Sequence, residues 1–116
     1  MENLTSITFK EKVFDYENEK TWKFLGDKPT IIDFWAQYCQ PCHKLSPILE
    51  EIQKEYEGKI NIYKVDTEAE SELSSVFQIR SIPTLLFIPM EGQPQMANGL
   101  VPKDKLIEII NSNLLK

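Results

Sequence analysis

Cysteine and histidine are scarce in this sequence. The 116 residues include two cysteines, Cys39 and Cys42, and one histidine, His43. A small secreted domain held together by disulfides carries more cysteines, spread along its chain, so that class is excluded. A structural zinc site takes four ligands, and these three side chains would need a carboxylate or an open position to complete one. We therefore expect neither a disulfide scaffold nor a metal, and no cofactor.

Clusters of basic residues and long apolar segments are also lacking. The formal net charge is -5 and no run of lysine or arginine interrupts it, which disfavours nucleic acid as a partner. The longest apolar stretch, PTLLFIPM, is far shorter than the ~18 residues that cross a bilayer. The N-terminal MENLTSITF has no basic segment followed by an apolar one, so it does not have the pattern of a signal peptide. We expect a cytoplasmic protein with no membrane association; an exported form whose signal peptide has been removed would look the same.

Turn residues divide the chain into alternating strands and helices. Breaks fall at GDKP, EG, MEG and NG, and the segments between them show strand or helix patterns. The predicted strands are residues 4–9, 30–36, 59–66, 84–88 and 93–98, and the predicted helices are residues 13–25, 42–56, 70–77 and a last one that begins at Pro102. In the first of these helices, Phe14, Trp22 and Leu25 are the expected buried side chains.

The order of these segments predicts an α/β fold. Strands that alternate with helices pair in parallel, and the closing pair across the MEG turn adds an antiparallel hairpin. We expect one domain over residues 1–116, with a single mixed five-stranded sheet flanked by helices on both faces. Ligands of such sheets gather at the carboxyl ends of the strands, and the two cysteines directly follow the strand that ends near Ala36.

The stretch CQPCH allows two kinds of chemistry. Cys-x-x-Cys-His is the attachment pattern of a c-type haem, whose iron would take His43 and, as a sixth ligand, Met90 or Met96. Cys-x-x-Cys alone is the pattern of a redox dithiol, which exchanges electrons with disulfides in other molecules. The spacing of the cysteines does not separate the two.

The sequence around the dithiol resembles the thioredoxin family. The similarity includes DFWAQYCQPCHKLSP and continues through KVD, IRSIPTLLFI, EGQ and NGLVPKDKL, in the family's order and over nearly the whole chain. The resemblance implies the thioredoxin fold and the reduction of disulfides in other proteins by dithiol–disulfide exchange. It also implies disulfide-containing protein substrates, a thioredoxin reductase for recycling, and a monomer. Within such a chain the haem pattern would be accidental.

Cys39 and Cys42 have different expected roles. Cys39 precedes a helix that starts near Pro41, where unpaired N–H groups and the helix dipole favour a thiolate and lower the thiol pKa. Cys42, one turn further on, is expected to be more buried. We therefore expect Cys39 to attack the substrate disulfide and Cys42 to release the mixed disulfide that forms.

Asp33 interrupts an otherwise apolar strand. An ionised carboxylate alone in a core is costly, so the pKa of Asp33 should rise or the side chain should find a partner. The resemblance implies that Asp33 lies behind the dithiol and acts as a general base toward Cys42, through water. It also places Lys64 beside Asp33, on the neighbouring strand. The alternative is an Asp at the strand edge with its side chain in solvent.

Six further residues form the expected substrate site. The resemblance implies a cis peptide between Ile82 and Pro83, facing the dithiol, which turns the Ile82 backbone toward an extended substrate segment. Gly99 would leave an open wall beside the same groove. The predicted substrate-binding residues are Tyr38, Ser81, Ile82, Pro83, Gly99 and Leu100.

Several residues depart from the family pattern. Gln40 stands where glycine is common between the cysteines, Tyr38 replaces a tryptophan, and His43 replaces a lysine. Gln78 stands where a glycine often ends the short third helix, and a left-handed turn there would strain it. Because residues between the cysteines strongly influence redox poise, Gln40 leaves isomerase or oxidase activity as an alternative. A thioredoxin-fold binding module, in which the groove matters more than the redox cycle, is the second alternative.

Overall fold

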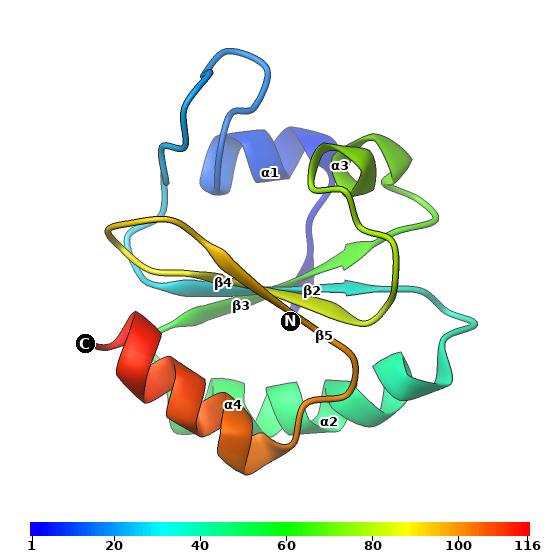
Figure 1. Cartoon of the computed structure of the whole chain (residues 1–116), viewed down its shortest axis with the longest axis vertical. Coiled ribbons are helices and arrows are strands. Elements are labelled where there is room, and N and C mark those ends of the chain that lie inside the picture. The colour runs from blue at the N-terminus through cyan, green and yellow to red at the C-terminus, as the bar shows by residue number, and fades with distance from the viewer.

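A five-stranded sheet lies between two layers of helices in the computed structural model, which describes all residues from Met1 to Lys116 (Figure 1). In spatial order the strands are β1 (Glu2–Asn3), β3 (Asn61–Asp66), β2 (Thr30–Trp35), β4 (Thr84–Ile88) and β5 (Gln95–Asn98). Helices α1 (Ser6–Lys12) and α3 (Ser71–Val76) cover one face, and α2 (Gln40–Glu55) and α4 (Lys103–Ile109) cover the other. A π-helical turn, Ile110–Leu114, continues α4.

The sheet is mixed, as predicted. Strands β1, β3 and β2 are parallel, whereas β4 pairs antiparallel with both β2 and β5. The predicted order of strands and helices along the chain is also the observed one. Pro102 is the N-cap of α4 rather than its first residue. The α/β architecture with helices on both faces is therefore confirmed.

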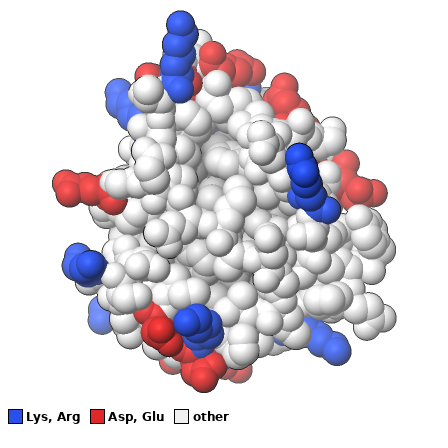
Figure 2. All heavy atoms as spheres, in the orientation of Figure 1, with Lys and Arg blue, Asp and Glu red and all other residues white.

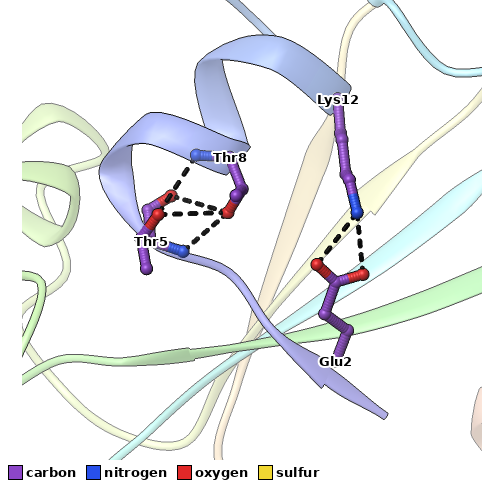
Figure 3. A network of polar contacts seen from close by, with 4 residues as sticks. All are labelled: Glu2, Thr5, Thr8 and Lys12. Carbon is purple, nitrogen blue, oxygen red and sulfur yellow. Dashed lines mark hydrogen bonds and ion pairs between the residues drawn. The ribbon is translucent and has the colours of Figure 1, made fainter.

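The strand predicted for residues 4–9 is wrong, because these residues begin a helix. The first strand is only Glu2–Asn3, and α1 starts at Ser6. Thr5 caps α1: its hydroxyl accepts a hydrogen bond from the Thr8 N–H, and the Thr8 hydroxyl accepts one from the Thr5 N–H (Figure 3). This reciprocal capping supplies partners for N–H groups that a helix start otherwise leaves free, and it outweighs the strand-like pattern of the segment.

The helix predicted for residues 13–25 is also wrong, because α1 ends before Val13 and an irregular loop follows. Polar side chains shape this loop: the Asn18 amide donates a hydrogen bond to the Asp15 carboxylate. Such local side-chain bonds compete with helix formation. Leu25, which was predicted to be buried, is 45% exposed. The aromatic side chains of the loop pack onto the core on the α1 side of the sheet; they are Phe14, Tyr16, Trp22 and Phe24.

Each face of the sheet carries its own apolar core, because side chains alternate along a strand. Ile31 of β2 packs with Leu49 of α2 on one face. Ile32, the next residue, packs with Phe9 of α1 on the other face. With both faces covered, β2 is buried along almost its whole length. Its carboxyl end leads directly into the loop that carries Cys39.

Charged side chains of both signs are spread over the surface. Around the edge of the face in Figure 2 they are interspersed, and no basic patch forms there. Lys103 joins α4 to α2 through ion pairs with Glu51 and Glu55. None of the helices combines the length and the apolar character that crossing a membrane requires.

Candidate active site

The two cysteines form a disulfide at the amino end of α2, directly after β2. Cys39 is the N-cap residue of the helix, and its Sγ accepts a hydrogen bond from the Cys42 N–H at 3.2 Å. Cys39 is the more accessible of the two, with 6% of its surface exposed against 2% for Cys42. The predicted difference in burial is therefore confirmed. The helix start presents an N–H donor and the positive dipole end to the Cys39 sulfur, an arrangement that favours a thiolate after reduction.

Asp33 lies within β2 and is fully buried. Neither of its carboxylate oxygens has a hydrogen-bond partner. Burial raises the pKa of Asp33 to about 7, and the positive charge of Lys64 opposes part of this rise. The alternative of a solvent-exposed Asp at the strand edge is therefore wrong. A carboxyl group with this pKa is present in both protonation states near neutral pH, so it can accept a proton and return it.

Lys64 is the register partner of Asp33 on β3, and the two side chains share the face that α2 covers. No ion pair joins them; instead, the Lys64 ammonium lies over the ring of Trp35, 4.2 Å from the ring centroid. Trp35 packs against the small cluster formed by Ala36 and the two cysteines. The predicted proximity of Lys64 and Asp33 is confirmed, and Trp35 connects this pair to the dithiol.

Two loops meet beside the dithiol. The Ile82–Pro83 peptide bond is cis, as the resemblance implied, and Ile82 packs against the cysteine cluster. The Gly99 N–H donates a hydrogen bond to the Pro83 carbonyl at 2.8 Å, and a hydrogen bond of 2.9 Å joins the side chains of Thr84 and Asn98. Gly99 has a φ of 88°, and a β-carbon at this position would meet no heavy atom within 4 Å. A side chain at Gly99 would therefore extend into open space, and the role of Gly99 as a wall of the substrate groove stays a prediction.

A groove of about 690 Å³ extends from the dithiol loop to α3. Of the predicted substrate residues, Tyr38, Ser81 and Ile82 line this groove, whereas Pro83, Gly99 and Leu100 lie outside it. The far wall was not predicted from the sequence; it comes from α3 and the segment after it, including Ser71, Ser75 and Arg80. Arg80 is the sole arginine of the chain and has no ion-pair partner. The one sign in the sequence that Arg80 belongs to the site is its position directly before the SIPT segment.

The fold and the dithiol together define a thiol–disulfide oxidoreductase. The thioredoxin family model matches residues 3–112. The chain is 49% identical to the thioredoxin of Borreliella burgdorferi over 108 residues, which are 93% of this chain and 92% of that one. It is 37% identical to thioredoxin 1 of Nostoc sp. over 111 residues, 96% of this chain and 94% of the other. The chain therefore belongs to the thioredoxin family.

A solved structure shows the same fold. The crystal structure of chloroplastic thioredoxin z matches with a TM-score of 0.81 over 96% of this chain and 91% of that chain, at 24% sequence identity. The predicted thioredoxin fold is thus confirmed. The chain is a protein-disulfide reductase that works by dithiol–disulfide exchange through its Cys-x-x-Cys pair. The haem interpretation falls with this assignment, and His43 is an exposed residue in the first turn of α2.

Proposed function

We propose that each residue of the site has a defined part in the reductive cycle. The Cys39 thiolate attacks one sulfur of a substrate disulfide, and the other substrate sulfur leaves as a thiolate. Cys42 then loses its proton, through water, to the Asp33 carboxylate and attacks the Cys39 sulfur. The second substrate thiolate leaves, both substrate sulfurs take up protons, and the protein keeps the Cys39–Cys42 disulfide. Two electrons pass from the protein to the substrate.

The observation that supports Asp33 as the proton acceptor is its buried carboxyl group without hydrogen bonds. An acceptor tied up in strong hydrogen bonds would stay ionised and bind a proton poorly. Burial instead raises the pKa of Asp33 to about 7, close to the pH at which a cytoplasmic enzyme works. Lys64 is the positive charge that favours the ionised, proton-accepting form.

We further propose that substrate binds in extended form along the cis-proline loop. The open space at Gly99 and the exposed side chains of Tyr38 and Leu100 leave room for a chain that pairs with the Ile82 backbone. Ser81 and Pro83 hold this loop in place: the Ser81 carbonyl accepts a hydrogen bond from the Thr84 hydroxyl at 2.6 Å. Main-chain pairing of this kind accepts many substrate sequences, which suits a general reductase.

The test is the reduction of insulin disulfides, followed as turbidity. Reduced protein should be active, and Cys39→Ser should abolish the activity, because the remaining thiol, Cys42, is more buried and lacks the N-cap position of Cys39. Asp33→Ala should slow the release of a preformed mixed disulfide more than its formation. Asp104→Ala, which removes an exposed carboxylate on α4, is the matched control and should slow neither step. Equal slowing of both steps by Asp33→Ala would remove Asp33 from the proton-transfer role.

Gln40 makes the redox poise a separate question. We propose that the dithiol is strongly reducing, which equilibration against glutathione would measure. A more oxidising value would favour isomerase or oxidase activity. A variant with both cysteines changed to serine should fail to complement a strain that lacks the protein; successful complementation would instead favour the binding-module alternative.

The proposed partners follow from family membership. We propose disulfide-containing proteins as substrates, a flavin-dependent thioredoxin reductase for recycling, a monomeric state and a cytoplasmic location. The confinement of both cysteines to one redox motif supports the location, because secreted domains use more cysteines. Reduction of the oxidised protein by a purified thioredoxin reductase tests the recycling step, and cell fractionation tests the compartment.

A further inference from the structure

Three polar side chains form a row across neighbouring strands. Asn3 on β1 is the register partner of Lys64 on β3, and Lys64 is the register partner of Asp33 on β2. Register partners on paired strands project from the same face of the sheet. The row therefore runs from the exposed edge of the sheet at Asn3 to the buried carboxyl group of Asp33.

Trp35 contacts two residues of this row. It stands two residues after Asp33 on β2, so it projects from the same face. Its indole N–H donates a hydrogen bond of 3.0 Å to the Oδ1 atom of Asn3. The Lys64 ammonium lies 4.2 Å from the centroid of the same ring. One indole thus contacts the first two members of the row, and Trp35 also packs against the cysteine cluster.

We propose that Asn3 is a positioning residue of the dithiol site: its side-chain amide fixes the Trp35 indole, and the fixed indole holds the Lys64 ammonium in its place beside the Asp33 carboxyl. This inference rests on the proposed role of Asp33, and it adds to that role a residue at the outer edge of the sheet. Asn3 touches neither substrate nor dithiol and acts only through Trp35 and Lys64.

The physical reason is the flexibility of lysine. A lysine side chain has a flexible four-carbon stem and a strongly hydrated ammonium, so the ammonium moves into water unless another group retains it. The face of an indole retains a cation within about 6 Å of its centroid. An indole that has lost the Asn3 hydrogen bond can rotate, which releases the ammonium. Water then screens its attraction for the Asp33 carboxylate.

Few charged groups other than Lys64 lie near Asp33. The neighbouring titratable groups on this face and in the first turn of α2 are Asp66, His43, Lys44 and the amino terminus at Met1, and none of them is buried. Asp66 accepts hydrogen bonds from the N–H groups of Glu68 and Ala69. Strand β4 opposes Asp33 with the apolar Leu85. Lys64 is accordingly the one charge that acts on the Asp33 pKa, which makes the position of its ammonium decisive.

The experiment is a titration of the Asp33 carboxyl carbon by NMR in the oxidised protein, where neither cysteine titrates. In Asn3→Leu, a substitution of similar size without an acceptor, the titration midpoint should move upward by roughly half a pH unit. The Trp35 indole N–H signal should also exchange faster with water. Glu2→Gln is the matched control on the same two-residue strand, because the Glu2 side chain pairs with Lys12 of α1 and not with Trp35 (Figure 3). An unchanged or lowered midpoint in Asn3→Leu, or an equal shift in Glu2→Gln, overturns the proposal.

A double-mutant cycle separates positioning from general loosening of β1. Trp35→Phe keeps a ring but removes the N–H that Asn3 accepts, so adding Asn3→Leu to it should produce no further shift of the midpoint. Additive shifts overturn the proposal. Release of a preformed mixed disulfide distinguishes this inference from the function on which it rests. If Asp33→Ala leaves release unchanged while Asn3→Leu still moves the midpoint, the catalytic role of Asp33 fails and the positioning role of Asn3 stands.

Discussion

Replacing Asp33 with alanine should stabilise the oxidised protein at high pH and not at low pH. Burial raises the pKa of Asp33 from its ordinary 3.8 to about 7 in the folded chain. Below the lower value the carboxyl is protonated in both the folded and the unfolded chain, so it has no effect on the difference between them. Between the two values the unfolded chain ionises while the folded chain keeps its proton, which lowers the free energy of unfolding as pH rises. Above about pH 7 the carboxyl is ionised in both states, and the free energy of unfolding falls no further on its account.

The size of this effect follows from the two pKa values. They differ by about three pH units, and each unit corresponds to about 1.4 kcal/mol, so the ionised carboxyl costs the folded state about 4 kcal/mol. Asp33→Ala lacks this cost. Its free energy of unfolding relative to the wild type should therefore rise by up to about 4 kcal/mol between about pH 4 and about pH 8. The small cavity left by the substitution lowers stability equally at both pH values and does not affect this difference.

Urea unfolding of the two oxidised proteins at both pH values measures the change. Every other carboxylate titrates in both proteins and cancels in the comparison. Asp27→Ala is the control, because the Asp27 side chain is 82% exposed and folding changes its surroundings little. A stability difference between Asp33→Ala and the wild type that does not depend on pH would refute the reasoning, since it would mean that burial does not disfavour the Asp33 carboxylate.

Two further substitutions test local features of the backbone. Thr5→Ala removes the reciprocal cap of α1 and should lower the free energy of unfolding by about 1 kcal/mol. Ser6→Ala, which keeps the cap, should have a much smaller effect. Equal effects of the two substitutions in urea unfolding would contradict the capping role. Gln78 has a φ of 55°, so Gln78→Gly should relieve about 1 kcal/mol of left-handed strain, partly offset by the greater freedom of glycine in the unfolded chain. Gln78→Ala keeps the β-carbon and should not raise the thermal midpoint, and a higher midpoint for Ala than for Gly would exclude strain as the cause.

The site was predictable from the sequence where its residues are close together in the chain. Cys39 and Cys42 lie within one helical turn of each other, and Asp33 is recognisable as a charged residue in an apolar strand. The segment from Leu4 to Leu25 was not predictable in this way. Its first turn depends on two threonine hydroxyls that bond reciprocally to the backbone, and its aromatic rings are placed by tertiary contacts rather than by helical spacing.

Contacts between segments that are distant in the sequence could not be predicted either. Asn3 and Trp35 are far apart in the sequence, and only the register of β1 against β3 brings the amide to the indole. The wall of the groove formed by Ser71 and Arg80 likewise depends on how α3 packs above the sheet. No periodicity or motif marks Asn3 or Ser71, because both are polar, exposed and ordinary in their local sequence.

The confinement of both thiols to a single disulfide has a practical consequence for measurement. With no third cysteine, an alkylating reagent can add to a molecule of this protein twice, once or not at all. Two additions report the dithiol, and no addition reports the internal disulfide. A single addition reports a molecule whose other sulfur is bonded to a partner. A mass spectrum of alkylated cell extract would therefore count the captured intermediates directly, and the mass removed by subsequent reduction would identify what each one held.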